Sequence, residues 1–278
     1  MRDDVYEVLA VRYGSRPSST ASESYNFARY REPDRPSRMD YYVFVARNRS
    51  RTVLIDCGYS AARARLHGRF AGNDLDRDAV EVLEELGVRA DDVDHVVLSH
   101  MHLDHMGNVD RFPRATFTVA RAEYEFWTGG YGRKEVFAQT VDRDEVDLLR
   151  RLADEGRVSL VEETGDPCPG VTVTRVGGHT PGQLMTEVTG ETGRVVLISD
   201  GAHFYSEFRR DRPFWLFSDI EEVYRSFETF RELDARPGVT VVPGHDPGIM
   251  DLFPAVVDGV AVDLTGPPQT VDTREPSS

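Results

Sequence analysis

Cysteine, lysine and long apolar runs are scarce in this chain of 278 residues. The two cysteines, Cys57 and Cys168, are distant in sequence, and in a reducing compartment such thiols need not form a disulfide, so we expect structural roles. Only Lys134 is a lysine among 33 basic residues, and it lies outside every motif discussed below, which argues against a Schiff-base mechanism. No segment approaches the roughly 20 consecutive apolar residues that a membrane-spanning helix needs.

Positive charge is also in deficit, because the formal net charge is −15. A protein that grips a phosphate backbone needs a basic surface, so this balance argues against a nuclease. The first 14 residues contain acids and lack a small-residue cleavage site, unlike a signal peptide. We therefore expect a cytoplasmic enzyme without nucleic-acid or membrane partners. Hydrophobic residues make up 40% of the chain, enough for one domain over residues 1–260.

The most informative segment is Val96–Asn108, VVLSHMHLDHMGN. It places His100, His102, Asp104 and His105 directly after a short apolar run. Histidine and carboxylate are the ligand types of zinc and related metals. In an extended segment, side chains two residues apart share a face, so the first two histidines can bind one ion. The side chains of Asp104 and His105 can then point at a neighbouring position. A solvated histidine-rich loop is the alternative.

Further ligand-type residues follow other predicted strands. These are His179 in VGGHTPGQ, Asp200 after VVLIS, and His245 in VVPGHDPG. Each lies near glycine or proline residues, which are typical of turns. Taken singly, each could be a capping carboxylate or a hydrogen-bonded loop histidine. Together with the HMHLDH segment they make seven candidates at four strand ends, a pattern that predicts a metal centre.

These motifs resemble the metallo-β-lactamase superfamily, whose HxHxDH signature corresponds to HMHLDH here. Within it, the chain is most similar to the N-acyl homoserine lactonase group, on the segments MDYYVFVA, RTVLIDCGY, GGHTPGQ, SDGAHFY and VVPGHDP. The resemblance runs from about Tyr6 to about Pro254. It implies an α/β fold of the αββα sandwich type, with two mixed β-sheets packed face to face and helices outside. The ligand motif is specific for fold and metal but only weakly specific for substrate, because the fold hosts many hydrolases.

The resemblance also implies a dinuclear centre with two divalent ions, expected to be Zn²⁺. It assigns His100, His102 and His179 to the first metal, Asp104, His105 and His245 to the second, and Asp200 to a bridge between them. The implied activity is opening of a lactone ring, N-acyl homoserine lactone or a related lactone, by attack of metal-bound hydroxide. Asp104 could also pass a proton to the leaving oxygen. A thioesterase or ester hydrolase on the same centre is the alternative, and a metal-binding scaffold without turnover is disfavoured by the complete ligand set.

The chain departs from the lactonase group after the bridging aspartate. Characterised lactonases carry a tyrosine three residues later, whereas this chain has His203 there and Tyr205 two residues further on. Either side chain could donate a hydrogen bond to the oxyanion or leaving group. The departure weakens the expectation of homoserine-lactone specificity more than it weakens the expectation of hydrolysis. Asp56, in IDCG, resembles the superfamily's structural aspartate and is expected to orient a ligand. We expect His67 and His95 to be structural.

Hydrophobic periodicity predicts alternating strands and helices. The predicted strands are Val5–Arg12, Tyr41–Ala46, Thr52–Asp56, Val158–Val161, Val171–Val176, Met185–Thr189 and Val195–Ser199, and the predicted helices are Asp78–Leu86, residues 142–156 and Ile220–Leu233. The polar, proline-bearing segment 261–278 predicts a disordered tail. A homodimer is common in the lactonase group and is left open here.

Two segments allow more than one interpretation. Residues 14–40, rich in Ser, Arg and Pro, predict a long irregular loop that is functional or solvated. By resemblance, Tyr25, Phe27 and Met39 of this loop could touch substrate. Between the two groups of ligand motifs lie further aromatic residues that could line a pocket or pack a helix onto the sheet, namely Tyr124, Phe126, Trp127 and Tyr131.

Overall fold

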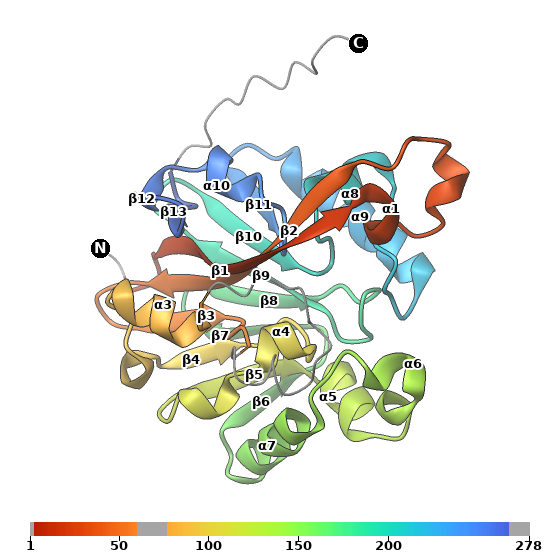
Figure 1. Ribbon diagram of the computed structural model, residues 1–278. Helices are drawn as coiled ribbons and strands as arrows, with labels where there is room; N and C mark the ends of the chain where they lie inside the picture. Colours follow the sequence, from red (N-terminus) through yellow and green to blue (C-terminus); the bar gives the residue numbers. More distant parts are fainter. Residues whose placement is uncertain (1–2, 60–76, 267–278) are drawn as a thin grey trace.

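The computed structural model describes residues 3–59 and 77–266, so His67 lies outside the described part (Figure 1). Within that part, the strands form an eight-stranded sheet of order β12-β13-β1-β2-β3-β4-β5-β6 and a five-stranded sheet of order β11-β10-β9-β8-β7. The pairs β3–β4, β4–β5, β5–β6 and β10–β11 are parallel, and the remaining pairs are antiparallel. Both sheets are therefore mixed, as predicted.

The strands of the larger sheet are β1 (Glu7–Ser19), β2 (Pro36–Arg47), β3 (Thr52–Ile55), β4 (His95–Val97), β5 (Thr116–Ala120), β6 (Val158–Val161), β12 (Ala255–Val257) and β13 (Ala261–Asp263). The strands of the smaller sheet are β7 (Thr164–Cys168), β8 (Val171–Arg175), β9 (Leu184–Thr189), β10 (Arg194–Ser199) and β11 (Val239–Pro243). The α-helices are α1 (Thr20–Glu23), α3 (Ala79–Glu85), α4 (Leu103–Met106), α5 (Arg121–Thr128), α6 (Glu135–Ala138), α7 (Arg143–Asp154), α8 (Tyr205–Arg210), α9 (Ile220–Asp234) and α10 (Ile249–Leu252). Short 3₁₀ turns are η1 (Phe27–Tyr30), η2 (Ala90–Asp92), η3 (Val109–Arg111) and η4 (Tyr131–Arg133).

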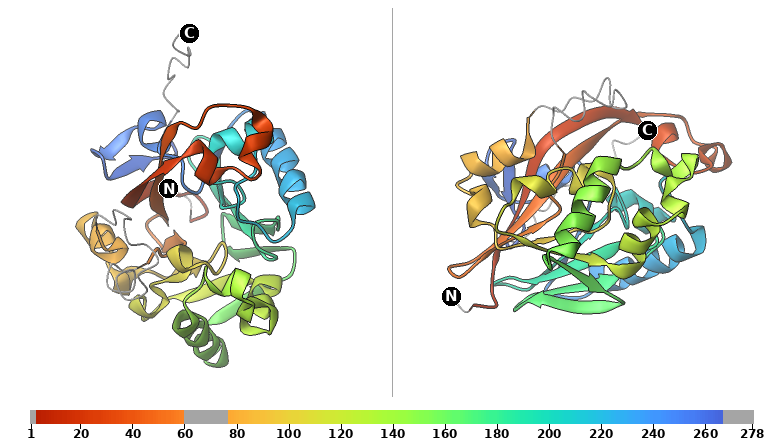
Figure 2. Two further views of the ribbon diagram at one scale, coloured as in Figure 1. Left: turned by 45° about the vertical axis from the view of Figure 1, so that its right-hand side comes forward. Right: turned by 90° about the horizontal axis from the view of Figure 1, so that it is seen from below.

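Alternation along the strands divides the apolar side chains between two cores. On β1, Val8 points into the core between the sheets, whereas Leu9 points to the opposite face. The first core continues to α8 and α9, and the second lies under α3, α5 and α7. Figure 2 shows these helices on the outer sides of the two sheets. The predicted αββα sandwich is confirmed.

The predicted helices begin at aspartate caps. Asp78 accepts the backbone N–H groups of Val80 and Glu81 at the start of α3. Asp142 and Asp219 cap α7 and α9 in the same way, because a carboxylate satisfies donors that have no partner within the helix. The observed bounds of these three helices differ from the predicted bounds by at most two residues.

The prediction of a long loop over residues 14–40 is wrong at both ends, where residues 14–19 and 36–40 belong to strands, and residues 20–35 connect them. β1 and β2 pair from Glu7↔Arg47 to Ser19↔Pro36, across an irregularity between Arg12 and Gly14, and form a long hairpin arm. Figure 1 shows the arm as a red and an orange strand that extend side by side toward α1. A two-stranded ladder is held by backbone hydrogen bonds and needs no apolar pattern on its exposed face, so polar composition misled the prediction.

The predicted tail also begins too early. β13 pairs antiparallel with β1, and Ala261, Val262 and Leu264 are fully buried. Burial of these apolar side chains makes residues 261–266 part of the fold, and residues 267–278 lie outside the described part. A search of the described helices found none that is long and apolar enough to cross a lipid bilayer.

Candidate metal centre

The predicted ligands gather at the ends of strands from both sheets. β4 leads into His100 and His102, and α4 begins directly after them. The loop between β8 and β9 carries His179, β10 ends next to Asp200, and β11 ends two residues before His245. Parallel neighbours such as β10 and β11 bring their carboxyl ends to one edge of a sheet, which is why ligands so distant in sequence meet here.

The first ligand cluster contains His100, His102, His179 and Asp200, whose ligand atoms all lie within 4.8 Å of one another. His102 Nδ1 and His179 Nε2 are 3.0 Å apart. The Nε2 atoms of His100 and His179 lie 3.8 and 3.5 Å from Asp200 Oδ2. This is the grouping that the sequence predicted for the first metal.

The second cluster contains Asp104, His105 and His245, within the same 4.8 Å limit. The Nε2 atoms of His105 and His245 lie 3.3 and 3.1 Å from Asp200 Oδ1. They are 3.6 and 3.8 Å from Asp104 Oδ2. Asp200 therefore turns one carboxylate oxygen to each cluster, the arrangement expected of a bridging ligand.

Hydrogen bonds behind the imidazoles fix which nitrogen faces each cluster. His179 Nδ1 lies 3.0 Å from the carbonyl oxygen of Leu216, and His245 Nδ1 lies 2.7 Å from that of Asp40. A carbonyl oxygen only accepts, so Nδ1 carries the proton and Nε2 keeps its lone pair for a metal.

Asp56 performs the orienting role that the sequence predicted. Its Oδ2 lies 2.8 Å from His105 Nδ1, while its Oδ1 accepts the Ser99 N–H at 2.7 Å. Asp56 and Ser199 both adopt left-handed backbone conformations, with φ of 63° and 46°. Such strain in non-glycine residues is costly and concentrates at functional sites. Here it places the side chains of Asp56 and Ser199 in one hydrogen-bonded group behind the metal ligands.

The donor set fits two divalent ions. Among the described residues, Nε2 of His100, His105 and His245 and Oδ1 of Asp200 are buried without a hydrogen-bond partner. Buried polar atoms are normally bonded, because leaving them without a partner is costly. A cation in each cluster would satisfy these atoms, and mixed imidazole and carboxylate ligands suit zinc and its neighbours.

Protonation of the histidines differs between the clusters. Burial lowers the pKa of His100 and His102 well below the ordinary value and that of His179 to about 3. These imidazoles are therefore neutral, which is the form that binds metal. Burial also acts to lower the pKa of His105, but the carboxylates of Asp200, Asp104 and Asp56 outweigh it and raise that pKa well above the ordinary value.

His203 lies at the centre, whereas Tyr205 does not. His203 Nε2 is 3.1 Å from Asp200 Oδ2, and its ring stacks on Phe214 with centroids 3.7 Å apart. Burial acts to lower the pKa of His203, but Asp200 and Glu207 raise it to about 9. The Tyr205 hydroxyl donates to the carbonyl of Val241 at 3.1 Å within the first core. This geometry gives Tyr205 a structural place and leaves His203 at the site.

Glu207 is a site residue that the sequence did not reveal. Its Oε1 accepts the N–H groups of His203 and Phe204 at 2.8 and 3.0 Å, and its Oε2 accepts that of Phe214 at 3.1 Å. The carboxylate thus holds His203 and the ring that stacks on it. Its only sequence signal is a position four residues after His203, one helical turn away.

A cavity of about 400 Å³ opens over the two clusters. Ligand residues form one part of its wall. The other parts of the wall come from the hairpin arm, the segment before α7 and the segment after α8. The lining residues beyond the ligands and His203 are Arg16, Met39, Tyr41, Leu103, Gln139, Thr140, Phe214, Trp215 and Leu216. Met39 thus lines the cavity, and its contact with substrate stays a prediction. Tyr25 and Phe27 are outside this lining set, because Tyr25 packs edge-on against Phe217 and Phe27 against Tyr30.

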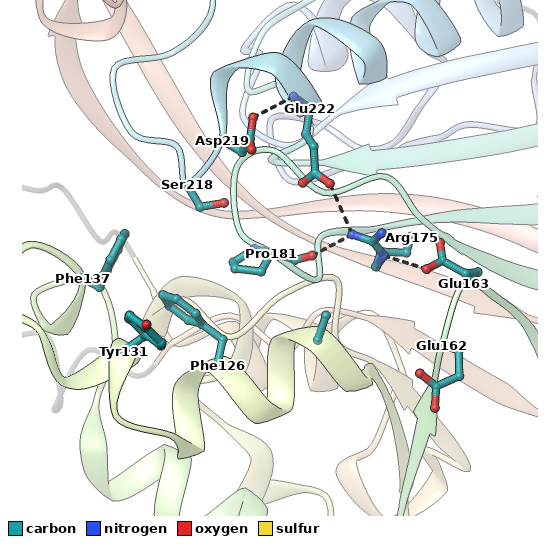
Figure 3. A pocket seen from close by; sticks show the side chains of 11 residues that line it. Phe126, Tyr131, Phe137, Glu162, Glu163, Arg175, Pro181, Ser218, Asp219 and Glu222 are labelled. Atoms are coloured by element: carbon teal, nitrogen blue, oxygen red, sulfur yellow. Dashed lines mark hydrogen bonds and ion pairs between the residues drawn. The ribbon is translucent and has the colours of Figure 1, made fainter.

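A second hollow of about 550 Å³ lies behind the loop that carries His179 (Figure 3). Phe126, Tyr131 and Phe137 lie on one side of it and Arg175 on the other. Arg175 is engaged by Glu163 at 3.3 Å, by Glu222 at 3.6 Å and by the carbonyl of Pro181 at 3.0 Å. The Arg175 cation in this hollow is therefore already paired.

The other residues singled out in the sequence have structural surroundings. Trp127 is buried with its ring edge toward His102, and Tyr124 packs against the second core. His95 lies between the hydroxyls of Thr116 and Thr118, and burial lowers its pKa to about 4. Both cysteines are free thiols, and Cys57 donates to the carbonyl of His105. Lys134 precedes α6, away from the cavity lining.

An αββα sandwich with two adjoining His/Asp clusters at its strand ends defines the class of metal-dependent hydrolases. Residues 38–245 match the Metallo-beta-lactamase superfamily, and the chain belongs to that superfamily. It is 36% identical over 191 residues to N-acyl homoserine lactonase AttM of Azorhizobium caulinodans, an alignment that covers 64% of this chain and 67% of that protein. It is 24% identical over 225 residues to N-acyl homoserine lactonase AiiA of Bacillus thuringiensis subsp. kurstaki, covering 77% and 84%.

Solved structures share the fold over most of the chain. An N-acyl homoserine lactone hydrolase with the product N-hexanoyl-L-homoserine at its catalytic metal centre superposes with a TM-score of 0.74, at 20% identity, over 91% of this chain and 98% of that one. AidC, a dizinc quorum-quenching lactonase, superposes with a TM-score of 0.69, at 18% identity, over 97% and 100%. At these identities the superpositions establish the fold.

Proposed function

We propose that this protein is a dinuclear metal-dependent hydrolase that opens lactone rings, with N-acyl homoserine lactones as the first substrate class. The observation that carries the proposal is the convergence of seven ligand-type residues in two clusters joined by Asp200. Four of them line one cavity, namely His102, Asp104, His179 and Asp200. The relatives named N-acyl homoserine lactonase supply the substrate class. A role in quorum quenching, the removal of acyl homoserine lactone signals, follows from that class.

His100, His102 and His179 would hold the first ion, Asp104, His105 and His245 the second, and Asp200 both. We propose Zn²⁺ as the ion, because three imidazoles with a carboxylate form a donor set that zinc favours. Bound divalent ions supply Lewis acidity toward a carbonyl oxygen and lower the pKa of water to about 7. The protein's part is to keep the imidazoles of the first cluster neutral through burial, and to aim His179 and His245 through the carbonyls of Leu216 and Asp40.

Two further side chains in the cavity are suited to handle the substrate's oxygens. His203 is held by Glu207 and Phe214 with one ring nitrogen toward Asp200, so it can donate a hydrogen bond where negative charge develops. Asp104 is the more exposed carboxylate of the centre, at 17% side-chain exposure, and lines the cavity. We assign Asp104 the delivery of a proton to the leaving oxygen.

The cavity wall suits a substrate with an apolar chain. Met39, Leu103, Phe214, Trp215 and Leu216 provide apolar surface beside the ligands, and Trp215 is 53% exposed. Contact with such surface would favour an acyl substituent over a bare lactone ring. A cytoplasmic location and a homodimer belong to the same proposal. The two free thiols agree with a reducing compartment.

Metal analysis combined with a hydrolysis assay tests the proposal. Purified protein is analysed for metal content and assayed with a pH indicator on N-acyl homoserine lactones, simple lactones, esters and thioesters. We expect about two zinc ions per chain and turnover of the acyl homoserine lactones. His100→Ala and His245→Ala should each lose metal and lower kcat/KM by at least about 100-fold, within the range for groups that stabilise a transition state.

A histidine outside the centre provides the matched control. His95→Gln changes a buried histidine that contacts only Thr116 and Thr118 among the hydrogen-bond partners described, and it should keep both metals and full turnover. Two metals with cleavage of thioesters or esters alone would move the function to that class. A folded protein without bound metal would contradict the proposal.

A further inference from the structure

The first ligand cluster draws its histidines from two separate loops. His100 and His102 lie directly after β4, whereas His179 lies in the loop before β9. His102 Nδ1 and His179 Nε2 are nevertheless only 3.0 Å apart. The first cluster can therefore form only if the two loops keep a fixed relative position.

The carboxylate of Glu123 joins these loops. Glu123 is the third residue of α5 and is fully buried. Its Oε1 accepts the backbone N–H of Met101 at 2.8 Å, and its Oε2 accepts that of Gly182 at 2.9 Å. Met101 lies between the first two histidine ligands and Gly182 lies three residues after the third. Each carboxylate oxygen thus holds one of the loops.

The residues around Glu123 allow the close approach of the two loops to its carboxylate. A Cβ on Gly182 would lie 2.3 Å from the Glu123 backbone nitrogen, so only glycine allows the loop to approach α5 this closely. Trp127, one turn later on the helix, donates its Nε1–H to Oε1 at 2.6 Å. The same indole ring meets His102 edge-on, with centroids 5.5 Å apart. Glu123 is therefore connected to the cluster through both loops and through Trp127.

A purely structural account of this residue is weaker. A buried carboxylate is costly unless several donors compensate it, and an apolar side chain would fill the same space without that cost. Three donors converge on Glu123, and two of them belong to the loops that carry metal ligands. Asp56 differs from Glu123, because it contacts an imidazole of the second cluster directly, at His105 Nδ1.

We propose that Glu123 is the positioning residue of the first metal, and that it sets the affinity of this site by holding the Met101 and Gly182 loops together. The inference rests on the metal-binding part of the proposed function and is independent of the substrate. Residues that orient metal ligands typically change affinity by 10–100-fold when they are replaced.

The test is metal affinity of the Glu123→Gln variant in the full-length chain. Glutamine keeps the shape but has a single acceptor oxygen, so it can hold only one of the two loops. Metal-free protein is titrated with Co²⁺ against a competing chelator, and binding is followed by the absorption of the cobalt ion. We expect one site weakened by roughly 10–100-fold and the other unchanged.

Thr118→Val is the matched control. Thr118 is buried on β5, the strand that leads directly into α5. Its hydroxyl contacts His95 and neither of the loops that carry the histidines of the first cluster. Loss of this buried hydrogen bond should lower the urea concentration at the unfolding midpoint and leave both Co²⁺ affinities unchanged. Equal weakening in the control and in Glu123→Gln would show a general effect of destabilisation and would overturn the proposal, as would two unchanged affinities in folded Glu123→Gln.

A measurement on the unmutated protein covers the case in which Glu123→Gln does not fold. Amide hydrogen exchange of metal-free protein, read residue by residue by NMR, should show Met101 and Gly182 protected before any metal is added. Rapid exchange at both amides without metal, followed by protection on adding Zn²⁺, would mean that the ion and not Glu123 orders the loops. Failure of lactone turnover with normal results here would count against the substrate class alone.

Discussion

Asp200 is the residue on which the histidines of the centre converge. Its Oδ2 faces His100, His179 and His203, and its Oδ1 faces His105 and His245, all within 3.8 Å. Burial acts to raise the pKa of this carboxyl, but the surrounding imidazoles outweigh it and hold the pKa well below its usual range. Asp200 is therefore ionised, as a ligand shared by two cations must be.

His203→Phe tests the role of the histidine beside that carboxylate. Phenylalanine retains the stack on Phe214 but removes the ring nitrogen, so we expect kcat/KM to fall by roughly 100–1,000-fold with both metals retained. Tyr205→Phe is the companion variant and should stay within about threefold of wild type, because its hydroxyl serves Val241 and not the cavity. The measurement is steady-state kinetics with metal analysis. Full activity in His203→Phe, or its loss in Tyr205→Phe, would reverse the assignment.

At the scale of elements, pairing at the sheet edge decides where the fold ends. β1 is held by β2 on one side and by β13 on the other. The N–H of Arg12 donates to Val260 and that of Leu264 donates to Val8, so the chain is bonded to β1 before and after β13. The beginning of the predicted tail is thereby converted into a strand that closes both cores beside β1.

Truncation distinguishes the strand from the residues beyond it. A chain that ends at Val260 loses the buried side chains of Ala261, Val262 and Leu264. At about 1.5–3 kcal/mol for each large apolar side chain, we expect the free energy of unfolding to fall by about 3–6 kcal/mol. Urea unfolding of this chain, of the full-length chain and of a control that ends at Gly266 measures the difference. Equal stability of the shortest chain and the control would contradict the pairing.

For the whole molecule, the two sheets place a polar, buried centre at one edge of an apolar interior. Fully buried imidazole nitrogens and the Asp200 oxygen lack hydrogen-bond partners among the described residues, and this arrangement opposes folding unless cations satisfy it. A net charge of −15 acts in the same direction, because negative self-repulsion is relieved when positive ions bind. Folding and metal binding should therefore be coupled.

Metal removal tests this coupling. A ligand that binds only the folded chain stabilises it by about 4 kcal/mol per site when its free concentration is 1,000 times its Kd. We expect chelation to lower the Tm measured by calorimetry and added Zn²⁺ to restore it. His245→Ala, which removes a ligand of the second cluster, should show a smaller response. An identical Tm with and without chelator, in protein shown to lose its metal, would contradict the coupling.

The sequence by itself determined the fold class, most strands and the seven candidate ligands, because HMHLDH and the ligand-type residues after apolar runs are local patterns. Tertiary structure decided what local patterns do not encode. It paired residues 14–19 with residues 36–41 in a hairpin arm and buried residues after Val260, since strand pairing depends on partners distant in sequence. It also placed His203 beside Asp200 and the Tyr205 hydroxyl on Val241 in the first core. It placed Glu123 and Glu207 behind the candidate ligands, because a carboxylate becomes a support only where folding brings donors around it.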